Sequence, residues 1–585
     1  MTEPLPASER VDVDVVVLGA GPTGLTAACL MADAGLSVAV VEQHPGTGDE
    51  PRAISATDEA LRIMQQLGVL PELAPETLLG TGARYTGRRG QVLADVRPPR
   101  PRLGQPGKSQ FDQPVMEGLL WKAAAARPGI LLHFGTEATR LAQTHDGVEL
   151  TGVRRGLRSQ GYRGDLAQDE AFALADSGTG DVVHQGGTPA SADAGAPPTE
   201  VTFRSQWLVA CDGGRSFARK ALGVGLEGST QVEKWIVVDL LDAGEGEPYA
   251  TFHCNGSRPA VVVPGVNGRR RYEFMLLPGE DEQAMVSAAS IRALVAEHQD
   301  VARLRVRRAA VYTAQQRLAS RWREGRVLLA GDAAHLMPPF AGQGLNAGLR
   351  DAAAAAWRVA EAVHGRAGQA LMDSYEAERK PHAAEMVKLS KRIGAVVMST
   401  NPLVCALRDA AIPALGVAPR AKAWLTTMKF LRQPRYHRGL AAPVAPDVPG
   451  PAADLLGRAL PQPDVVPAEG GAVVKLDDVL GSGFAWLAVA GPGELWVTCP
   501  GQAPVVVRTV AGTVDPGILD AAVGHELLVR PDRYIAAVVP IGARRGAYTS
   551  LADALPGLAD QFAVPSGGHL LGVTSWGSPN VTPRR

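Results

Sequence analysis

Residues 12–43, DVDVVVLGAGPTGLTAACLMADAGLSVAVVEQ, hold the pattern that decides the fold. A valine-rich run, typical of a strand buried on both faces of a parallel sheet, leads into the loop GAGPTG. Gly19 lets the chain turn out of the strand, Gly21 lets backbone approach a pyrophosphate, and Gly24 lets the next helix pack closely. A second apolar run then ends in Glu42. This order predicts a strand, loop, helix and strand that bind a dinucleotide.

The acid at the end of the second run narrows the choice of dinucleotide. Glu42 lies 23 positions after Gly19 and is followed by Gln43. A carboxylate here can accept hydrogen bonds from ribose hydroxyls and would repel a 2′-phosphate. We therefore expect NAD or FAD, in contact with Glu42 and Gln43, rather than NADP.

The bulk composition favours a protein of several domains that binds small molecules. Its 585 residues exceed what one hydrophobic core usually serves. The 59 basic and 60 acidic residues leave a net charge of -1, so we expect neither nucleic acid nor a membrane as a partner. The first residues lack the features of a secretory signal, which predicts a cytoplasmic protein. The five cysteines lie far apart without a CxxC spacing, so we expect reduced thiols and no metal site.

Polar residues between apolar runs mark four further stretches. They are EPRAISATDEALRIMQQLGV (50–69), SQFDQPVMEGLLWKAA (109–124), WLVACDGGRSFARKALG (207–223) and GRVLLAGDAAHLMPPFAGQGLNAGLRDAAAAAWRVA (325–360). In the last, a buried strand ends in Asp332, and glycines let backbone amides approach a planar ring. A helix from about Leu345 then points its N-terminus at that ring, which favours negative charge there.

Together with the glycine loop, these stretches resemble the class A flavoprotein aromatic hydroxylases, the family that includes p-hydroxybenzoate hydroxylase and phenol hydroxylase. The resemblance implies FAD as the cofactor. Besides the glycine loop, Glu42 and Gln43, it implies FAD contacts at Arg52, Gln113, Asp212, Gly213, Gly331, Asp332, Gly342, Gly344, Leu345 and Asn346. His335, which follows Asp332 closely, is expected to pack and hydrogen-bond rather than to act as a base.

The resemblance and the patterns together predict an α/β fold. It consists of a Rossmann-like FAD-binding domain of the glutathione-reductase type, an inserted antiparallel substrate sheet, a helical region and a thioredoxin-like C-terminal domain. The expected boundaries are 10–225 for the first part of the FAD domain, with a flexible loop at 155–200, then 226–320 for the substrate sheet, 321–440 for the second FAD part and helices, 441–469 for a linker and 470–585 for the last domain. Cys499 lacks a CxxC partner, so a structural role is expected there. The helices could also form a homodimer contact.

The resemblance implies that the expected substrate sheet forms the wall of the substrate pocket, so residues of the sheet and of the loop PPFAGQGLNAG (338–348), called the flavin loop below, are candidates for that wall. They are Val262, Pro264, Arg271, Tyr272, Phe274, Pro338 and Phe340. Strand alternation means that about half of any strand faces away. We select Arg271, Phe274 and Pro338, and we expect Arg271 to pair with a substrate carboxylate if the substrate is a small acid.

The family resemblance implies a monooxygenase reaction. NADH or NADPH reduces FAD, O2 adds at the flavin C4a position, and the hydroperoxide hydroxylates a small phenolic ring. Segments such as EFMLLPGE (273–280) and VLLAGDAAH (327–335) are most similar to the sequences of one branch of the family. Enzymes of that branch convert 3-(3-hydroxyphenyl)propionate or 3-hydroxycinnamate to the catechol. Two alternatives remain: a tailoring hydroxylase of an aromatic polyketide, and a flavin dehydrogenase or quinone reductase without oxygen insertion.

Overall fold

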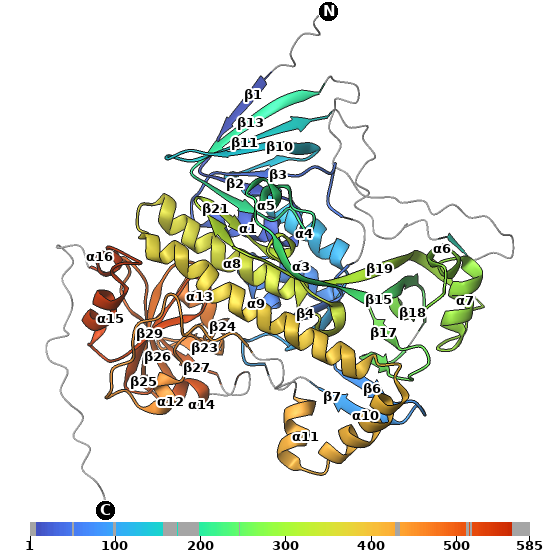
Figure 1. Ribbon diagram of the computed structural model, residues 1–585. Coiled ribbons are helices and arrows are strands. Elements are labelled where there is room, and N and C mark those ends of the chain that lie inside the picture. The colour runs from blue at the N-terminus through green and yellow to red at the C-terminus, as the bar shows by residue number, and fades with distance from the viewer. Residues whose placement is uncertain are drawn as a thin grey trace, which may run out of the picture.

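The computed structural model describes residues 8–48, 52–97, 101–155, 172–173, 198–244, 246–302, 304–427, 433–510, 514 and 517–563. Most of the segment 155–200, predicted as a flexible loop, therefore lies outside the described residues. Figure 1 shows three bodies: a central α/β body, a sheet domain to its right and a C-terminal β domain to its left.

A six-stranded sheet forms the base of the central body, in the order β20-β21-β14-β2-β3-β9. Its strands are β2 (Val15–Leu18), β3 (Val38–Val41), β9 (Ile130–His133), β14 (Trp207–Ala210), β20 (Arg323–Glu324) and β21 (Val327–Leu329). All neighbours are parallel except β20 and β21. Because every side chain of β2 and β3 is buried, the valine-rich runs are apolar on both faces.

Three helices cover this sheet, and all three start at predicted cofactor motifs. Helix α1 (Pro22–Asp33) follows the glycine loop, α4 (Gln113–Ala125) follows the second stretch, and α8 (Gly344–Val363) follows the flavin loop. Helix α1 packs against both of the others. The N-termini of α1, α4 and α8 therefore belong to one packed unit (Figure 1).

Two smaller sheets flank the central body. One consists of β1 (Ser8–Asp12), β10 (Thr136–Gln143), β11 (Val148–Arg154) and β13 (Thr199–Ser205). Strands β11 and β13, which precede and follow the 155–200 segment, pair antiparallel. The other has the order β4-β8-β5, with β4 (Ser55–Thr57), β5 (Thr77–Leu78) and β8 (Lys108–Phe111), and leads into α2 (Asp58–Gln66) and α3 (Leu70–Leu73).

A nine-stranded sheet forms the second body. Its strands are β6 (Ala83–Thr86), β7 (Val92–Val96), β12 (Phe172–Ala173), β15 (Leu226–Leu241), β16 (Ala250–His253), β17 (Ala260–Pro264), β18 (Arg270–Leu276), β19 (Arg305–Ala319) and β22 (His335–Leu336). The prediction confined this sheet to 226–320, yet β6 and β7 come from the first part of the chain. The β6–β16 pair is also parallel, so the expected antiparallel sheet is mixed at this point. Helices α6 (Glu282–Met285) and α7 (Ala288–Ala296) lie beside it.

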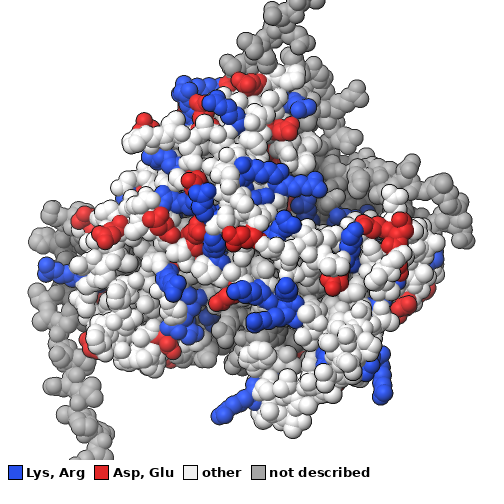
Figure 2. Space-filling view, viewed as in Figure 1, with Lys and Arg blue, Asp and Glu red and all other residues white. Residues whose placement is uncertain are grey.

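The helical region contains α9 (Gln369–Val397), α10 (Pro402–Leu415) and α11 (Pro419–Thr426). Figure 2 shows few charges on the lower lobe that α10 and α11 form, while blue and red residues alternate elsewhere on this face. Leu403, Leu407 and Val417 are exposed there. Among the described residues no single helix is long and apolar enough to span a bilayer; α9 and α10 meet the criteria only as a pair bent by 101°.

The C-terminal body is a seven-stranded sheet in the order β24-β23-β27-β26-β25-β28-β29. Its strands are β23 (Asp464–Pro467), β24 (Val474–Lys475), β25 (Ala485–Gly491), β26 (Glu494–Thr498), β27 (Val505–Thr509), β28 (His525–Val529) and β29 (Ile535–Pro540). All pairings are antiparallel. A thioredoxin-type sheet has parallel neighbours joined by crossover helices, so that part of the prediction does not match this topology.

The start of this body also corrects a predicted boundary. The segment 441–469, expected to be a linker because of its prolines, contains helix α12 (Gly450–Ala453) and strand β23. Ala452 and Leu460 are buried in the same core as the sheet. The remaining helices are α13 (Leu476–Leu480), α14 (Gly517–Asp520), α15 (Arg544–Leu551) and α16 (Leu558–Gln561).

Candidate functional site

The three glycines of the first loop meet very different surroundings. A Cβ on Gly19, where φ is +102°, would lie 2.4 Å from the carbonyl oxygen of Cys211. A Cβ on Gly24 would lie 1.9 Å from the carbonyl oxygen of Gly19. A Cβ on Gly21 would meet nothing within 4 Å. Gly19 and Gly24 are thus required by the fold itself, whereas Gly21 borders open space at the start of α1, where a phosphate group fits.

Glu42 shapes the same loop. Its Oε2 accepts a hydrogen bond from the backbone N–H of Ala20, and its Oε1 accepts one from His44, both at 2.9 Å. Gln43, next to it, is exposed. The carboxylate therefore holds the glycine loop against the end of β3, and each of its oxygens has a further lone pair for a ribose hydroxyl.

Gln113 joins the first two cofactor motifs. Its Oε1 accepts a hydrogen bond from the N–H of Ala53 at 2.5 Å, and its Nε2 donates to Oε1 of Glu117 at 2.6 Å. Glu117 also accepts the N–H of Gly48 at 3.0 Å, and burial raises its pKa to about 7. Gln113 thus fixes the chain directly after Arg52. Sequence analysis missed Glu117, although its i, i+4 spacing from Gln113 on α4 could have indicated it.

Asp212 and Gly213 lie beside the glycine loop. One carboxylate oxygen of Asp212 accepts the N–H of Ala218 at 3.0 Å. The other, Oδ1, is buried without a hydrogen-bond partner among the described residues. Burial raises the pKa of this carboxyl group. Gly213 adopts a φ of +77°. A buried acceptor with no partner is a feature that a bound nucleotide would satisfy.

Asp332 follows β21 closely, in a short 3-10 helix at Gly331–Ala333. It is exposed, yet desolvation by the surrounding protein raises its pKa, while electrostatic interactions with His335 and Arg52 act to lower it. Gly331, with φ +59°, lies so close to Thr23 that a Cβ would be 2.7 Å from its hydroxyl. The two strand-end motifs therefore converge on one site.

His335 has the structural role that was expected. It is fully buried, its Nε2 lies 2.7 Å from Oδ2 of Asp351, and its ring stacks on Trp322. Asp351 also accepts the N–H of Gly331 at 3.1 Å. The histidine therefore connects the flavin loop to α8 and is enclosed by protein.

Asn346 closes the flavin loop through its side chain. Its Nδ2 donates to the carbonyl oxygens of Ser55 at 3.1 Å and Gly342 at 2.6 Å, and its Oδ1 accepts the N–H of Thr57 at 2.9 Å. Gly342 has φ +60°. Leu345, beside Gly344 in the first turn of α8, is half-buried. The loop and the N-terminus of α8 are thus held rigidly against β4.

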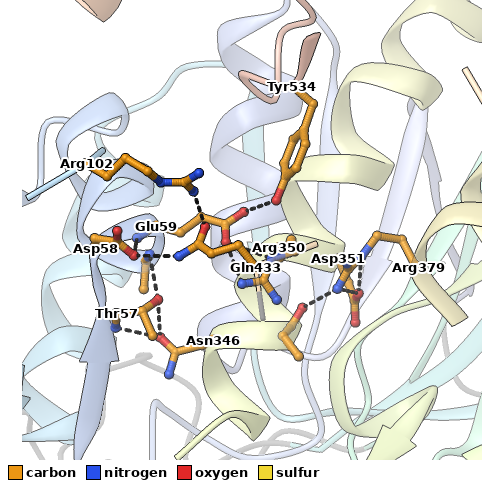
Figure 3. Close-up of polar contacts among 12 residues, drawn as sticks. Thr57, Asp58, Glu59, Arg102, Asn346, Arg350, Asp351, Arg379, Gln433 and Tyr534 are labelled. Atoms are coloured by element: carbon orange, nitrogen blue, oxygen red, sulfur yellow. Dashed lines mark hydrogen bonds and ion pairs between the residues drawn. The ribbon is translucent and has the colours of Figure 1, made fainter. Parts of the chain in front are cut away.

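A chain of buried charges supports this helix from behind, as Figure 3 shows. Arg350 of α8 donates from Nε to Oε2 of Glu59 at 2.8 Å, and the hydroxyl of Tyr534 donates to Oε1 of Glu59 at 2.7 Å. Arg379 of α9 donates to Oδ1 of Asp351 at 2.8 Å. Because Tyr534 belongs to the C-terminal body, the helix under the flavin loop contacts three separate parts of the chain.

Strand register decides which sheet residues face the flavin loop. In β15, β18 and β19, cross-strand neighbours align Trp235 with Met275 and Tyr312, Val237 with Glu273 and Ala310, and Asp239 with Arg271 and Arg308. We call this set the inner face. Phe340 of the flavin loop packs edge-on against Trp235, with 5.3 Å between ring centroids. The inner face is therefore the one turned toward the flavin loop.

Phe274 lies on the opposite face, which corrects its selection as a pocket residue. It is fully buried, stacks on Tyr272 and packs with Ile291 and Leu294 of α7. Val262 pairs with Tyr272 and Pro264 with Arg270, so both share that outer face. These residues were selected because the family resemblance implies a pocket wall on this sheet, and a period of two gives no indication of which half of a strand faces the pocket.

Arg271 is on the inner face, but its charge is already paired. Its Nε and Nη2 donate to the carboxylate of Asp239 at 2.7 and 3.1 Å, and its Nη1 donates to the carbonyl oxygen of Arg52 at 2.7 Å. The side chain is buried. The expected pairing of Arg271 with a substrate carboxylate is therefore not what this geometry supports. Arg271 instead fastens the Arg52 segment to the sheet.

Pro338 lies where the flavin loop meets α9. It is buried, and its carbonyl oxygen accepts a hydrogen bond from the hydroxyl of Ser390 at 2.9 Å. The inner face adds Glu273, Tyr312 and Trp235, which sequence analysis missed. Their signal was present, because each is separated by an even number of positions from a neighbour on the same face, but the register was not known.

The site combines three features: the glycine loop before α1, the carboxylate of Asp332 after β21, and the flavin loop, which leads into α8 and lies against the inner face of the sheet. Together they define a class of FAD-binding α/β proteins. The family model described as FAD binding domain matches residues 12–162 and 180–390. The chain belongs to this family, and FAD is its cofactor. The open space at Gly21 and the unpartnered Oδ1 of Asp212 fit such a group.

The relatives are more specific. The chain is 36% identical over 564 residues to 3-(3-hydroxy-phenyl)propionate/3-hydroxycinnamic acid hydroxylase 2 of Burkholderia vietnamiensis, covering 91% of this chain and 94% of that protein. It is 34% identical to the corresponding hydroxylase of Burkholderia cenocepacia, with the same coverage. The protein is therefore a flavoprotein monooxygenase of the aromatic hydroxylase family, as the sequence resemblance implied.

Solved structures of similar proteins share the arrangement. An anhydrotetracycline hydroxylase from Streptomyces rimosus matches with a TM-score of 0.65 and 25% identity, over 93% of this chain and 99% of that chain. The flavin-dependent monooxygenase PieE, solved with FAD and substrate, matches with a TM-score of 0.67 and 20% identity, over 93% and 99%. The likeness includes the C-terminal body as well as the FAD-binding part.

Proposed function

We propose that this enzyme uses NADH or NADPH and O2 to hydroxylate the phenolic ring of 3-(3-hydroxyphenyl)propionate or 3-hydroxycinnamate to the catechol. The observation that carries the proposal is the inner face of the sheet, which the contact between Trp235 and Phe340 holds against the flavin loop. Tyr312 of the inner face supports the proposal. Its side chain is about half exposed, although burial raises its pKa to about 12. An apolar wall with a few polar groups suits a small aromatic ring.

For FAD, we propose contacts at the positions that the sequence indicated. Gly19, Gly21, Gly24 and Glu42 would hold the adenosine and pyrophosphate end, with Gln43 at its edge. Arg52, Gln113, Asp212, Gly213, Gly331 and Asp332 would hold the middle of the cofactor, and Gly342, Gly344, Leu345 and Asn346 would hold the ring. When bound, FAD supplies the redox chemistry that activates oxygen.

The protein's own residues position the reactants and exclude water. The N-terminus of α8 stabilises negative charge at the flavin ring through its unpaired amides. Phe340 and Trp235 close one side of the site with apolar surface, and Pro338 anchors that closure to α9. Excluding water strengthens the local electrostatic interactions and protects reactive oxygen species from breakdown.

The test is substrate-dependent turnover of the purified yellow enzyme. NADH and NADPH oxidation, oxygen uptake and products are followed with 3-(3-hydroxyphenyl)propionate, with 3-hydroxycinnamate and with a polycyclic phenol. We expect the small acids to accelerate nicotinamide oxidation and to give a catechol, with one O2 consumed per nicotinamide. Product only from the polycyclic phenol would favour polyketide tailoring. Nicotinamide oxidation coupled to a quinone, without any hydroxylated product, would indicate a reductase and overturn the proposal.

A further inference from the structure

The inner face carries one carboxylate with no assigned role. Glu273 lies in β18, between β15 and β17, and its cross-strand neighbours are Val237 of β15 and Val261 of β17. Its side chain is 13% exposed, and among the described residues its carboxylate makes no hydrogen bond. Burying a charged carboxylate between valines costs free energy unless a partner forms a hydrogen bond with it. The carboxylate of Glu273 is therefore expected to have a partner that binds during function.

The nearest cation is committed elsewhere. Nη1 of Arg271 lies 4.0 Å from Oε1 of Glu273, but the guanidinium already binds Asp239 through two nitrogens and the carbonyl oxygen of Arg52 through Nη1. Burial raises the pKa of Glu273, Arg271 opposes this shift, and Asp239 adds to it. The carboxylate therefore keeps proton affinity that its neighbours do not fully offset.

Glu273 and groups of the flavin side act on the same tyrosine. Asp332 and Glu273 both raise the pKa of Tyr312, while Arg52 lowers it. Tyr312 projects from the same face of the sheet, two strands away from Glu273. The charged and titratable groups on and around the inner face include Glu273, Asp239, Arg271, Arg308 and Tyr312 from the sheet, and Asp112, Asp332 and Arg52 from the FAD-binding part.

We propose that Glu273 binds the hydroxyl group of the phenolic substrate and accepts its proton. The inference rests on the proposed function. An Oε atom of Glu273 takes the proton as the aryl O–H bond breaks, which leaves a neutral carboxylic acid and a phenolate. The phenolate ring is more electron-rich at its ortho and para positions, where the oxygen atom is added, and the proton passes back to the product hydroxyl. The carboxylates of Glu273 and Asp239 direct an acidic substrate's own carboxylate away from this part of the inner face.

The first test compares Glu273→Gln with wild type. Glutamine keeps the shape and a hydrogen bond but accepts no proton, and general base catalysis typically contributes ~10²–10⁴-fold. We expect product formation to fall by at least about 100-fold while FAD content and thermal midpoint stay unchanged. In wild type, kcat/KM should decline toward acid as Glu273 becomes protonated, and this decline should be absent in Glu273→Gln. Glu273→Asp should restore part of the rate.

A second arm separates base chemistry from structural damage. A ring-fluorinated analogue that is already ionised at the assay pH needs no base, so it should bring the rate of Glu273→Gln to within a few fold of wild type. Titration of the oxidised enzyme, followed by the flavin spectrum, should give similar dissociation constants for the phenol in both proteins. Glu282→Gln removes an exposed carboxylate of the same domain, paired with Lys234, and serves as the control.

The inference fails if Glu273→Gln forms product within about threefold of wild type with the same acid limb, or if the ionised analogue gives no rescue. In either case the proposed function stands, since wild type still makes the catechol. If wild type hydroxylates none of the phenolic acids, the proposed function itself is wrong and the inference falls with it.

Discussion

At the residue scale, Gly21 and Gly24 stand three positions apart in one loop and differ in what they serve. Gly24 has no room for a Cβ because the backbone of Gly19 is in the way, whereas Gly21 has room and a φ of -72° that alanine adopts readily. The sequence motif has glycine at both positions and does not show the different reasons for it. Only the structure shows that the fold requires Gly24 to be glycine and leaves room for a side chain at Gly21, where we propose the pyrophosphate.

The pair of alanine variants should therefore separate folding from cofactor binding. Gly21→Ala is expected to leave the unfolding free energy of the apoprotein within about 0.5 kcal/mol of wild type, as at an unstrained surface site, and to weaken FAD binding at least tenfold. Gly24→Ala should lower the unfolding free energy of the apoprotein by several kcal/mol, because the new Cβ would clash with backbone atoms, and moving a side chain cannot relieve that clash. Calorimetry and FAD titration measure the two effects. Unchanged FAD affinity in Gly21→Ala would contradict the proposed pyrophosphate site.

Site residues could be predicted where a motif is local. Gly19, Asp212 and Asp332 closely follow strand ends, and strand ends of a parallel sheet meet at one edge, so local pattern was enough to bring them together. Glu273 could not be found in this way. Its position on the inner face depends on the register between strands that are far apart in sequence, and a shift of one residue moves every side chain to the other face.

At the scale of elements, the βαβ unit and the long strands β15 and β19 were predictable, because their apolar runs are long and bounded by turn residues. The additions at the edge were not. Strands β6 and β7 join the second body from the first part of the chain, and β23 lies in a stretch whose prolines indicated a linker. In each case a distant partner strand decides the pairing, and no local signal reports it.

At the scale of the whole molecule, the C-terminal body reaches α8 at two places: Asp532 accepts a hydrogen bond from the indole N–H of Trp357 at 3.0 Å, and Tyr534 reaches the start of the helix through Glu59. Tyr534 is buried, packs on Tyr436 with 4.5 Å between ring centroids, and donates to Glu59, which in turn binds Arg350 of α8. The only cysteine in the described part of this body, Cys499, has no disulfide partner. Contact with α8 therefore gives the C-terminal body a structural role, which is to support the helix that follows the flavin loop.

Tyr534→Phe tests that contact with the ring retained. One oxygen of the buried Glu59 carboxylate would lose its partner, which costs about 1–3 kcal/mol. We expect lower stability and faster backbone hydrogen exchange at the start of α8, measured by mass spectrometry on holoenzyme and apoprotein. Tyr548→Phe changes a hydroxyl that binds Trp486 within the C-terminal body and should affect that body alone. Exchange at the start of α8 that is equally slow in Tyr534→Phe and wild type would show that the Tyr534–Glu59 contact does not support the flavin helix.

Isotopic labelling tests most directly whether this enzyme inserts oxygen from O2 into a phenolic ring. The holoenzyme is supplied with NADH or NADPH, 3-(3-hydroxyphenyl)propionate and ¹⁸O2, and the product is analysed by mass spectrometry. We expect a catechol that carries one ¹⁸O atom, with no label acquired from ¹⁸O-labelled water in the reciprocal experiment. Nicotinamide oxidation that yields only hydrogen peroxide or a reduced quinone, with the aromatic acid unchanged for this and the other phenols, would contradict this expectation.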